Sequence, residues 1–127
     1  MNVLQYGLSS RVQLVQGQWF APLAGTFDGI VANPPYIPSA HVDDLPPDVR
    51  QEPRVSLDGG TDGASAIRHL MDQAPQRLTS GGVLALECGE DHVRRWLQAV
   101  RAAPWSEQAC PIHDLAGRPR GILVTHV

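Results

Sequence analysis

The stretch Phe27–Tyr36, which reads FDGIVANPPY, decides how this chain folds. Its first six residues are mostly apolar, and a short run of this kind is typical of a buried β-strand. Asn33-Pro34-Pro35 then ends the strand abruptly, because proline lacks the backbone N–H that a strand needs. The sequence therefore predicts a strand, Phe27–Ala32, whose carboxyl end leads directly into a rigid turn.

Two helices and a further strand are predicted after this stretch. The first helix carries apolar residues at the spacing of one helical face: Ile67, Leu70, Met71, Ala74 and Leu78. We expect Pro75 to tighten its last turn and Ser80–Gly82 to end it. The nearly continuous apolar run Val83–Cys88 predicts a buried central strand. The second helix places four apolar residues on one face: Val93, Trp96, Leu97 and Val100.

The remaining extended segments complete an α/β pattern. Arg11–Val15 alternates polar and apolar residues and predicts a strand, while 108–112 and 121–126 are joined by a turn at Ala116–Pro119. The order is strand, strand, loop, helix, strand, helix, strand, strand. This order predicts an α/β sheet that ends in an antiparallel hairpin, and 127 residues are the length of one domain.

Composition excludes several classes of protein. Apolar residues make up 43% of the chain and charged residues 18%, which is typical of a globular protein. There is no apolar run long enough for a membrane span and no signal peptide, so we expect a cytoplasmic protein without a membrane partner. The net charge of −3 argues against strong nonspecific nucleic-acid binding. Cys88 and Cys110 lack Cys-x-x-Cys spacing and are predicted to be reduced and buried.

A long loop follows the proline turn. Between Ile37 and Thr61 the chain holds four prolines and five acidic residues, and long irregular loops in compact domains are usually functional or disordered. Gly59–Gly63 closes the loop with turn-forming residues. The five histidines share no ligand spacing, so no metal site is predicted.

Asn33-Pro34-Pro35-Tyr36 carries the clearest chemical signal. Ligands of open α/β sheets bind just beyond the carboxyl ends of the strands. An amide or aromatic NH₂ group is a poor nucleophile, and two acceptors, the Asn33 side-chain oxygen and a rigid proline carbonyl, can orient it. Tyr36 can pack flat against the planar group. The alternative is a plain turn that leaves a strand.

With these residues the chain resembles the HemK/PrmC family of protein-(glutamine) methyltransferases, which act on peptide release factors. The matching stretches follow the family's order and span most of the chain: Gly17–Leu23, Phe27–Ile37, Asp48–Pro53, Leu57–Gly63, Ser80–Gly89 and Asp114–Arg118. Asn-Pro-Pro-Tyr alone is shared with adenine and guanine amino methyltransferases. The later stretches favour the protein-glutamine branch.

The resemblance implies a role for each matching site residue. Asn33, Pro34, Pro35 and Tyr36 would bind the substrate glutamine, with Asn33 and Pro34 acting in catalysis. Trp19 and Asn33 would lie beside the cofactor, S-adenosyl-L-methionine, and a peptide chain release factor would be the protein partner. Read without the resemblance, Trp19 is a core or interface tryptophan. Gln18 departs from the acidic residue usual in the family.

Parts of the family pattern have no counterpart here. The chain contains no Gly-x-Gly spacing, whereas the family binds its cofactor with a glycine-rich loop after its first strand. The resemblance therefore implies a partial Rossmann-like class I methyltransferase sheet without its first two strands. Residues 1–127 would form a single, amino-terminally truncated catalytic domain that lacks an amino-terminal half. We expect this chain alone to bind the cofactor weakly at best, unless another chain supplies the missing half. Two alternatives remain open, a nucleic-acid amino-group methyltransferase and a noncatalytic remnant.

Overall fold

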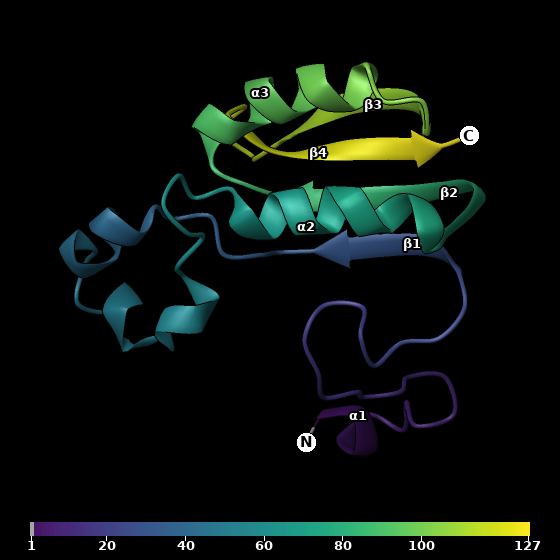
Figure 1. The fold of residues 1–127 in the computed structure, drawn as a ribbon. Coiled ribbons are helices and arrows are strands. Elements are labelled where there is room, and N and C mark those ends of the chain that lie inside the picture. Colours follow the sequence, from purple (N-terminus) through teal and green to yellow (C-terminus); the bar gives the residue numbers. More distant parts are fainter. Residues whose placement is uncertain (1) are drawn as a thin grey trace.

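A computed structural model describes residues 2–127, which contain a four-stranded sheet in the order β1-β2-β4-β3 (Figure 1). The strands are β1 (Phe27–Ala32), β2 (Leu78–Glu87), β3 (Ser106–His113) and β4 (Pro119–His126). β1 and β2 are parallel, whereas β4 runs antiparallel to both of its neighbours. The mixed α/β fold with a closing antiparallel hairpin, predicted from the order of the elements, is confirmed.

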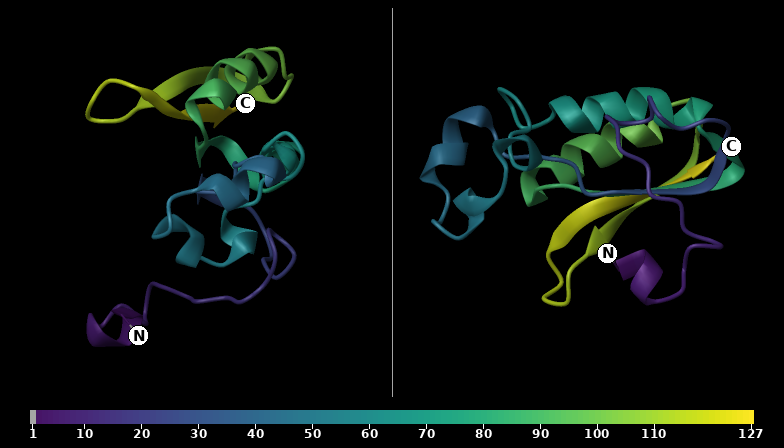
Figure 2. Two further views of the ribbon diagram at one scale, coloured as in Figure 1. Left: turned by 90° about the vertical axis from the view of Figure 1, so that its left-hand side faces the viewer. Right: turned by 90° about the horizontal axis from the view of Figure 1, so that it is seen from below.

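Both longer helices pack against one face of the sheet (Figure 2). They are α2 (Ser65–Gln73) and α3 (Glu90–Arg101). Their apolar faces meet alternate residues of the central strands, and the largest fully buried side chains lie in this layer: Ile67, Leu84, Leu86, Ile122, Val124 and Cys88. The helical spacing predicted on α2 and α3 is confirmed for the residues that enter this core.

The opposite face of the sheet is bare within residues 2–127. Val31 of β1 pairs with Ala85 of β2, which in turn pairs with Leu123 of β4, so the three side chains share this face. Val31 is 86% exposed and Ile112 of β3 is 38% exposed. No described helix packs over them, in contrast to the face that α2 and α3 cover.

The first helix ends earlier than the sequence pattern predicts. α2 stops at Gln73, and a 3₁₀ turn over Ala74–Gln76 contains Pro75, which lacks the N–H for a further helical bond. Leu78 therefore begins β2 rather than ending a helix. Gly81 lies inside the bounds of β2 with φ of 76°, where the pairing of β1 and β2 changes register. The prediction that Ser80–Gly82 ends the helix is wrong.

The predicted strand at Arg11–Val15 is also wrong. These residues form no strand, and Val12, Leu14 and Val15 are exposed. Alternation alone does not make a strand, because a strand also needs a neighbour to accept its backbone hydrogen bonds. No described segment offers one here, and the short helix α1 (Asn2–Gln5) has no buried residue.

The long loop has local order. It contains three 3₁₀ turns, Ser39–Asp44, Val49–Gln51 and Arg54–Ser56, and an isolated parallel bridge joins Ile37 to Asp58. Figure 1 shows the loop projecting beyond the carboxyl end of β1. The prediction of an irregular loop that leads into a glycine turn is confirmed, with positive φ at Gly60 and Gly63.

The two cysteines have opposite surroundings. Cys88 is fully buried after β2, and burial raises the pKa of its thiol to about 11. Cys110 is exposed, so its predicted burial is wrong. β3 is an edge strand, and Cys110 pairs with Leu123 on the bare face. Within residues 2–127, no helix combines the length and apolar character needed to cross a membrane.

Candidate active site

A cavity of about 380 Å³ lies along β1 and reaches its carboxyl end. Its wall is mostly apolar and includes Trp19, Phe20, Ile30, Asn33 and Leu70. The volume lies within the ~300–1,000 Å³ common for small-molecule sites. The two residues that the family resemblance places beside the cofactor, Trp19 and Asn33, thus line one cavity.

Trp19 has an unusual backbone conformation. Its φ is 52°, the only positive value outside glycine among residues 2–127. A side chain in this region costs free energy, and such strain is concentrated at functional sites. The indole ring lies 5.2 Å from the His69 ring, measured between centroids, at an interplanar angle of 42°. Phe20, the next residue, is buried in the core and holds the turn against it. Trp19 therefore lines the cavity from a turn that is fixed in place.

A second cavity of about 210 Å³ begins where the first one ends. One wall is the continuous segment Asn33–Ile37, and the other comes from the long loop, with Val49, Glu52, Ser56 and Leu57. Asn33 and Pro34 line both cavities. The Asn-Pro-Pro-Tyr motif therefore lies at the junction of an apolar cavity and a more polar one.

The motif presents acceptors at this junction. Asn33 is exposed, and within residues 2–127 no hydrogen bond engages its side-chain amide. Pro34 is buried and, like Pro35, has no N–H, so this segment offers carbonyl oxygens without competing donors. The side-chain oxygen of Asn33 and an adjacent carbonyl can together accept both hydrogens of an NH₂ group.

Asp58 holds the loop that forms the far wall of the second cavity. Its carboxylate accepts hydrogen bonds from Ser39 Oγ at 2.6 Å and from the Gly60 N–H at 2.9 Å. Arg54 Nε lies 3.2 Å from the same carboxylate, and Arg54 also pairs with Asp43 at 2.9 Å. The hydrogen bond from Ser39 Oγ is the main cause that lowers the pKa of Asp58 below its ordinary value.

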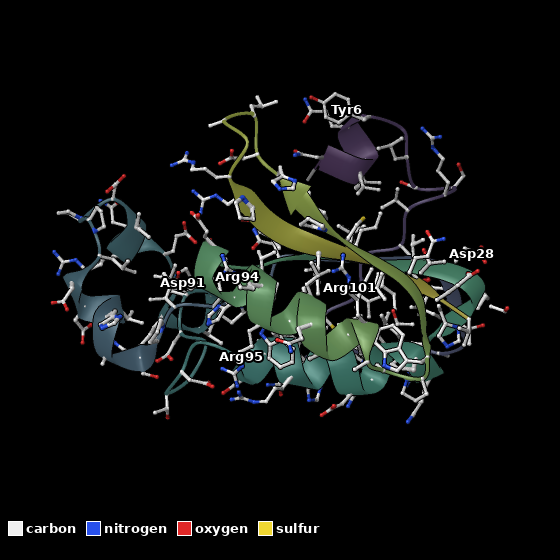
Figure 3. All side chains as sticks on the ribbon, turned by 90° about the horizontal axis from the view of Figure 1, so that it is seen from above. Tyr6, Asp28, Asp91, Arg94, Arg95 and Arg101 are labelled. Carbon is white, nitrogen blue, oxygen red and sulfur yellow. The ribbon has the colours of Figure 1, made fainter. Side chains whose placement is uncertain are left out.

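A charged cluster joins the two helices at the same end of the molecule. Asp62 pairs with Arg68 of α2 at 2.8 Å and with Arg95 of α3 at 3.5 Å. The hydrogen bonds from Arg68 hold the pKa of Asp62 well below its usual range. Figure 3 shows Arg94, Arg95 and Arg101 along α3. The guanidinium group of Arg95 also lies 5.6 Å from the ring centroid of Trp96.

Several residues that line the two cavities were not predicted as site residues from the sequence. Phe20, Ile30 and Leu70 line the first cavity, but in the sequence they are indistinguishable from core residues. Glu52 and Leu57 line the second cavity. They lie close to the Asn-Pro-Pro-Tyr motif only because the long loop folds back toward it. Within residues 2–127, no three His, Cys, Asp or Glu side chains are grouped as metal ligands.

The comparison with known proteins agrees with the resemblance seen in the sequence. No family model matches the chain. The release factor glutamine methyltransferase of Moorella thermoacetica is 49% identical over 125 residues, which cover 96% of this chain and 44% of that protein. The corresponding protein of Bradyrhizobium diazoefficiens is 43% identical over 122 residues, covering 95% of this chain and 41% of that protein.

A related activity is also represented. The ribosomal protein uL3 glutamine methyltransferase of Bordetella pertussis is 44% identical over 91 residues, which cover 71% of this chain and 30% of that protein. The chain thus spans less than half the length of these curated relatives. Over the matched residues, the chain is similar to part of the release factor glutamine methyltransferases.

Proposed function

We propose that this protein takes part in methyl transfer from S-adenosyl-L-methionine to the side-chain amide of a glutamine in a protein substrate, namely a peptide release factor. The observation that carries the proposal is the position of Asn33 and Pro34, which line both cavities. One cavity would hold the methyl donor and the other the substrate. The names of the relatives support the acceptor, since both kinds act on protein glutamine.

The first cavity fits the adenosine part of the methyl donor. Its aromatic and aliphatic wall suits a planar base, with Trp19 and Phe20 as the ring-bearing residues nearest the strained turn. Asn33 brings a polar group to the end that faces the second cavity. Neither aspartate nor glutamate is present in this wall to bind the ribose hydroxyls. When bound, S-adenosyl-L-methionine supplies an electrophilic methyl group.

The chain's own contribution is orientation. Asn33 Oδ1 and the Pro34 carbonyl would accept the two hydrogens of the glutamine amide, which directs the nitrogen lone pair toward the first cavity. Tyr36 and Pro35 would flank the planar amide. No strong general base is needed, because the amide nitrogen becomes acidic as it is alkylated.

The fold supports a larger sheet. We propose that residues 1–127 form part of a single Rossmann-like class I methyltransferase domain, whose sheet extends beyond β1. β1 has one neighbour, β2, among the described strands, and one sheet face is bare. Parallel sheets are normally covered on both faces. A strand on the free side of β1 would fill the first gap, and a helix packed over the bare face would fill the second.

A nucleic-acid substrate is the less favoured alternative. The loop that borders the second cavity carries five acidic residues against Arg50 and Arg54, and Arg54 is engaged by Asp43 and Asp58. A negatively charged rim repels the phosphate backbone on which nucleic-acid affinity depends. This charge balance favours a protein substrate.

Methyl transfer from labelled S-adenosyl-L-methionine tests the proposal, with a release factor, ribosomal protein uL3 and RNA as alternative acceptors. We expect a methylated glutamine in the release factor. Asn33→Ala should lower the rate at least ~100-fold. Asn2→Ala is the matched control, because Asn2 is the only other asparagine and is exposed. Methylated RNA would support the alternative, and no transfer to any acceptor would favour a noncatalytic remnant.

A further inference from the structure

The turn Gly59–Gly63, called here the glycine turn, lies directly against the Asn-Pro-Pro-Tyr motif. The Ile37 N–H donates to the Leu57 carbonyl at 3.1 Å, and the Gly59 N–H donates back to the Ile37 carbonyl at 2.8 Å. These bonds form the parallel bridge between Ile37 and Asp58. The residue that follows the motif is therefore paired with the segment that enters the glycine turn.

Two of its glycines leave no room for a side chain. A Cβ at Gly59 would come within 2.8 Å of Tyr36 Cα, which real Cβ atoms essentially never do. A Cβ at Gly63 would overlap the Tyr36 carbonyl oxygen, and Gly63 also has φ of 70°. A Cβ at Gly59 would also meet the Gly63 carbonyl group, and one at Gly63 would lie 3.0 Å from His92 Cε1. Both positions thus require glycine, and at both the obstacle includes the backbone of Tyr36.

The surroundings hold the glycine turn in this position. Asp58 accepts hydrogen bonds from Ser39 Oγ and from the Gly60 N–H. The Ser65 N–H donates to the Gly59 carbonyl at 2.9 Å, which fixes the turn to the start of α2. His92 of α3 lies on its outer side, with Nε2 3.2 Å from the Asp62 carbonyl oxygen. Both helices therefore support the turn.

The Tyr36 ring is confined from a second direction. A Cβ built at Gly89, the residue before α3, would lie 3.5 Å from Tyr36 Cδ2, an ordinary packing distance. The ring therefore lies beside the start of α3 while the glycine turn contacts its backbone. Two independent contacts leave Tyr36 little freedom, and through the rigid Pro34-Pro35 segment they limit the directions of the carbonyls before it.

We propose that Gly59 and Gly63 are positioning residues for the glutamine site. By letting the turn lie on the Tyr36 backbone, they fix the direction of the Pro34 carbonyl that accepts from the substrate amide. The inference rests on the proposed function of the motif. It adds a role for a turn that does not line either cavity beside the motif.

Gly63→Ala tests the proposal, with Gly117→Ala as its matched control. Both glycines have positive φ, 70° and 78°, but a Cβ at Gly117 meets nothing within 4 Å. The two variants therefore share the backbone cost and differ in the contacts of the added methyl group, which at position 63 meets the Tyr36 carbonyl oxygen first and then His92 and Pro38. We expect Gly63→Ala to lower kcat for glutamine methylation about 10- to 100-fold, with KM for S-adenosyl-L-methionine unchanged. Gly117→Ala should keep the kcat of the unmodified chain.

A measurement without catalysis separates failure of this proposal from failure of the proposed function. Backbone NMR shifts of residues 33–37 should change in Gly63→Ala and stay unchanged in Gly117→Ala. If the unmodified chain transfers no methyl group, the proposed function fails and these shifts alone decide the positioning role. Equal shifts in the two variants, or equal kcat values, would overturn it.

A second pair of variants serves if Gly63→Ala does not fold. Asp58→Ala removes the acceptor of Ser39 and Gly60, whereas Asp44→Ala removes an exposed carboxylate from the same loop. We expect changed NMR shifts in residues 33–37 for Asp58→Ala only. Unchanged shifts at those residues in Asp58→Ala would contradict the proposal.

Discussion

Both faces of the sheet carry mostly apolar side chains, but the described helices cover only one of them. Ile122 and Leu86 are fully buried under α2 and α3, whereas Val31 on the other face is 86% exposed. The central strand β2 is nearly continuously apolar over Val83–Leu86, as strands are when both of their faces are covered. The sequence of β2 therefore suits a sheet with two covered faces, although the described residues cover only one.

The covered face and the site depend on one another. α2 and α3 supply the core, and the segments before them, Gly59–Gly63 and Gly89, contact Tyr36. The bare face also reaches the motif, since Val31 and Asn33 line a third cavity with Ile112 on that side. The candidate site therefore lies at the boundary between the two faces.

Matched isoleucines give the largest expected difference between the faces. Ile122→Ala removes a fully buried side chain and should lower the free energy of unfolding by about 2–5 kcal/mol. Ile112→Ala, on the bare face and 38% exposed, should cost about 1 kcal/mol or less. Urea unfolding of both variants measures the two values. Equal losses would show that the bare face is covered in solution.

Loss of the ion pair between Asp62 and Arg68 should have a smaller effect on the free energy of unfolding, and this effect should depend on pH. The pKa of Asp62 is held below its ordinary value of 3.8, chiefly by the hydrogen bonds from Arg68, so its contribution to stability is present above that pH. The contribution is lost as pH falls from 3.8 toward the lower folded-state pKa. The stability difference between the unmodified protein and Asp62→Asn should therefore be constant between about pH 7 and 5 and shrink below about pH 4.

Asp72→Asn is the control for this measurement, because Asp72 is an exposed carboxylate on α2, the helix that carries Arg68. Thermal unfolding over a pH series compares the two variants. Parallel curves for both would contradict the role assigned to Asp62 in joining α2 and α3.

Substitutions on the bare face should change the free energy of unfolding least, but they should change the tendency of the chain to self-associate. Val31→Thr keeps the branched shape suited to a strand and should change the free energy of unfolding by less than about 0.5 kcal/mol. Exposed apolar patches promote association, so this variant should self-associate less in sedimentation velocity. Thr125→Val, on the same face, should associate more. The opposite order would contradict an exposed face.

The strands and helices with strong periodicity were predictable from sequence. β1, α3 and the closing hairpin follow from local pattern, because their side chains alternate or recur as the core requires. Arg11–Val15 has a strand pattern but no strand, because pairing depends on a neighbour that local sequence does not reveal. The end of α2 was predicted too late because Ala74 and Leu78 fit the helical spacing, whereas the helix ends at Gln73 and a 3₁₀ turn follows.

The motif at the candidate site was also predictable, since Asn33–Tyr36 follows a recognisable strand. The second wall of its cavity was not, because Glu52 and Leu57 approach the motif only through the folded loop. The contact of Gly59 and Gly63 with Tyr36 depends on backbone packing across more than 20 residues of sequence. The glycines at 59–63 predict a turn at these residues, but they do not predict that the turn contacts the backbone of Tyr36.

An amide NMR titration of this chain with S-adenosylhomocysteine, and then with a glutamine peptide from a release factor, tests whether the two cavities meet at Asn33 as a methyl-donor site and a substrate site. We expect the first ligand to shift the signals of Trp19 and Ile30, the peptide to shift those of Tyr36 and Leu57, and both to shift that of Asn33. Saturable shifts confined to the bare face, or no saturable shift with either ligand, would contradict this assignment of the two cavities.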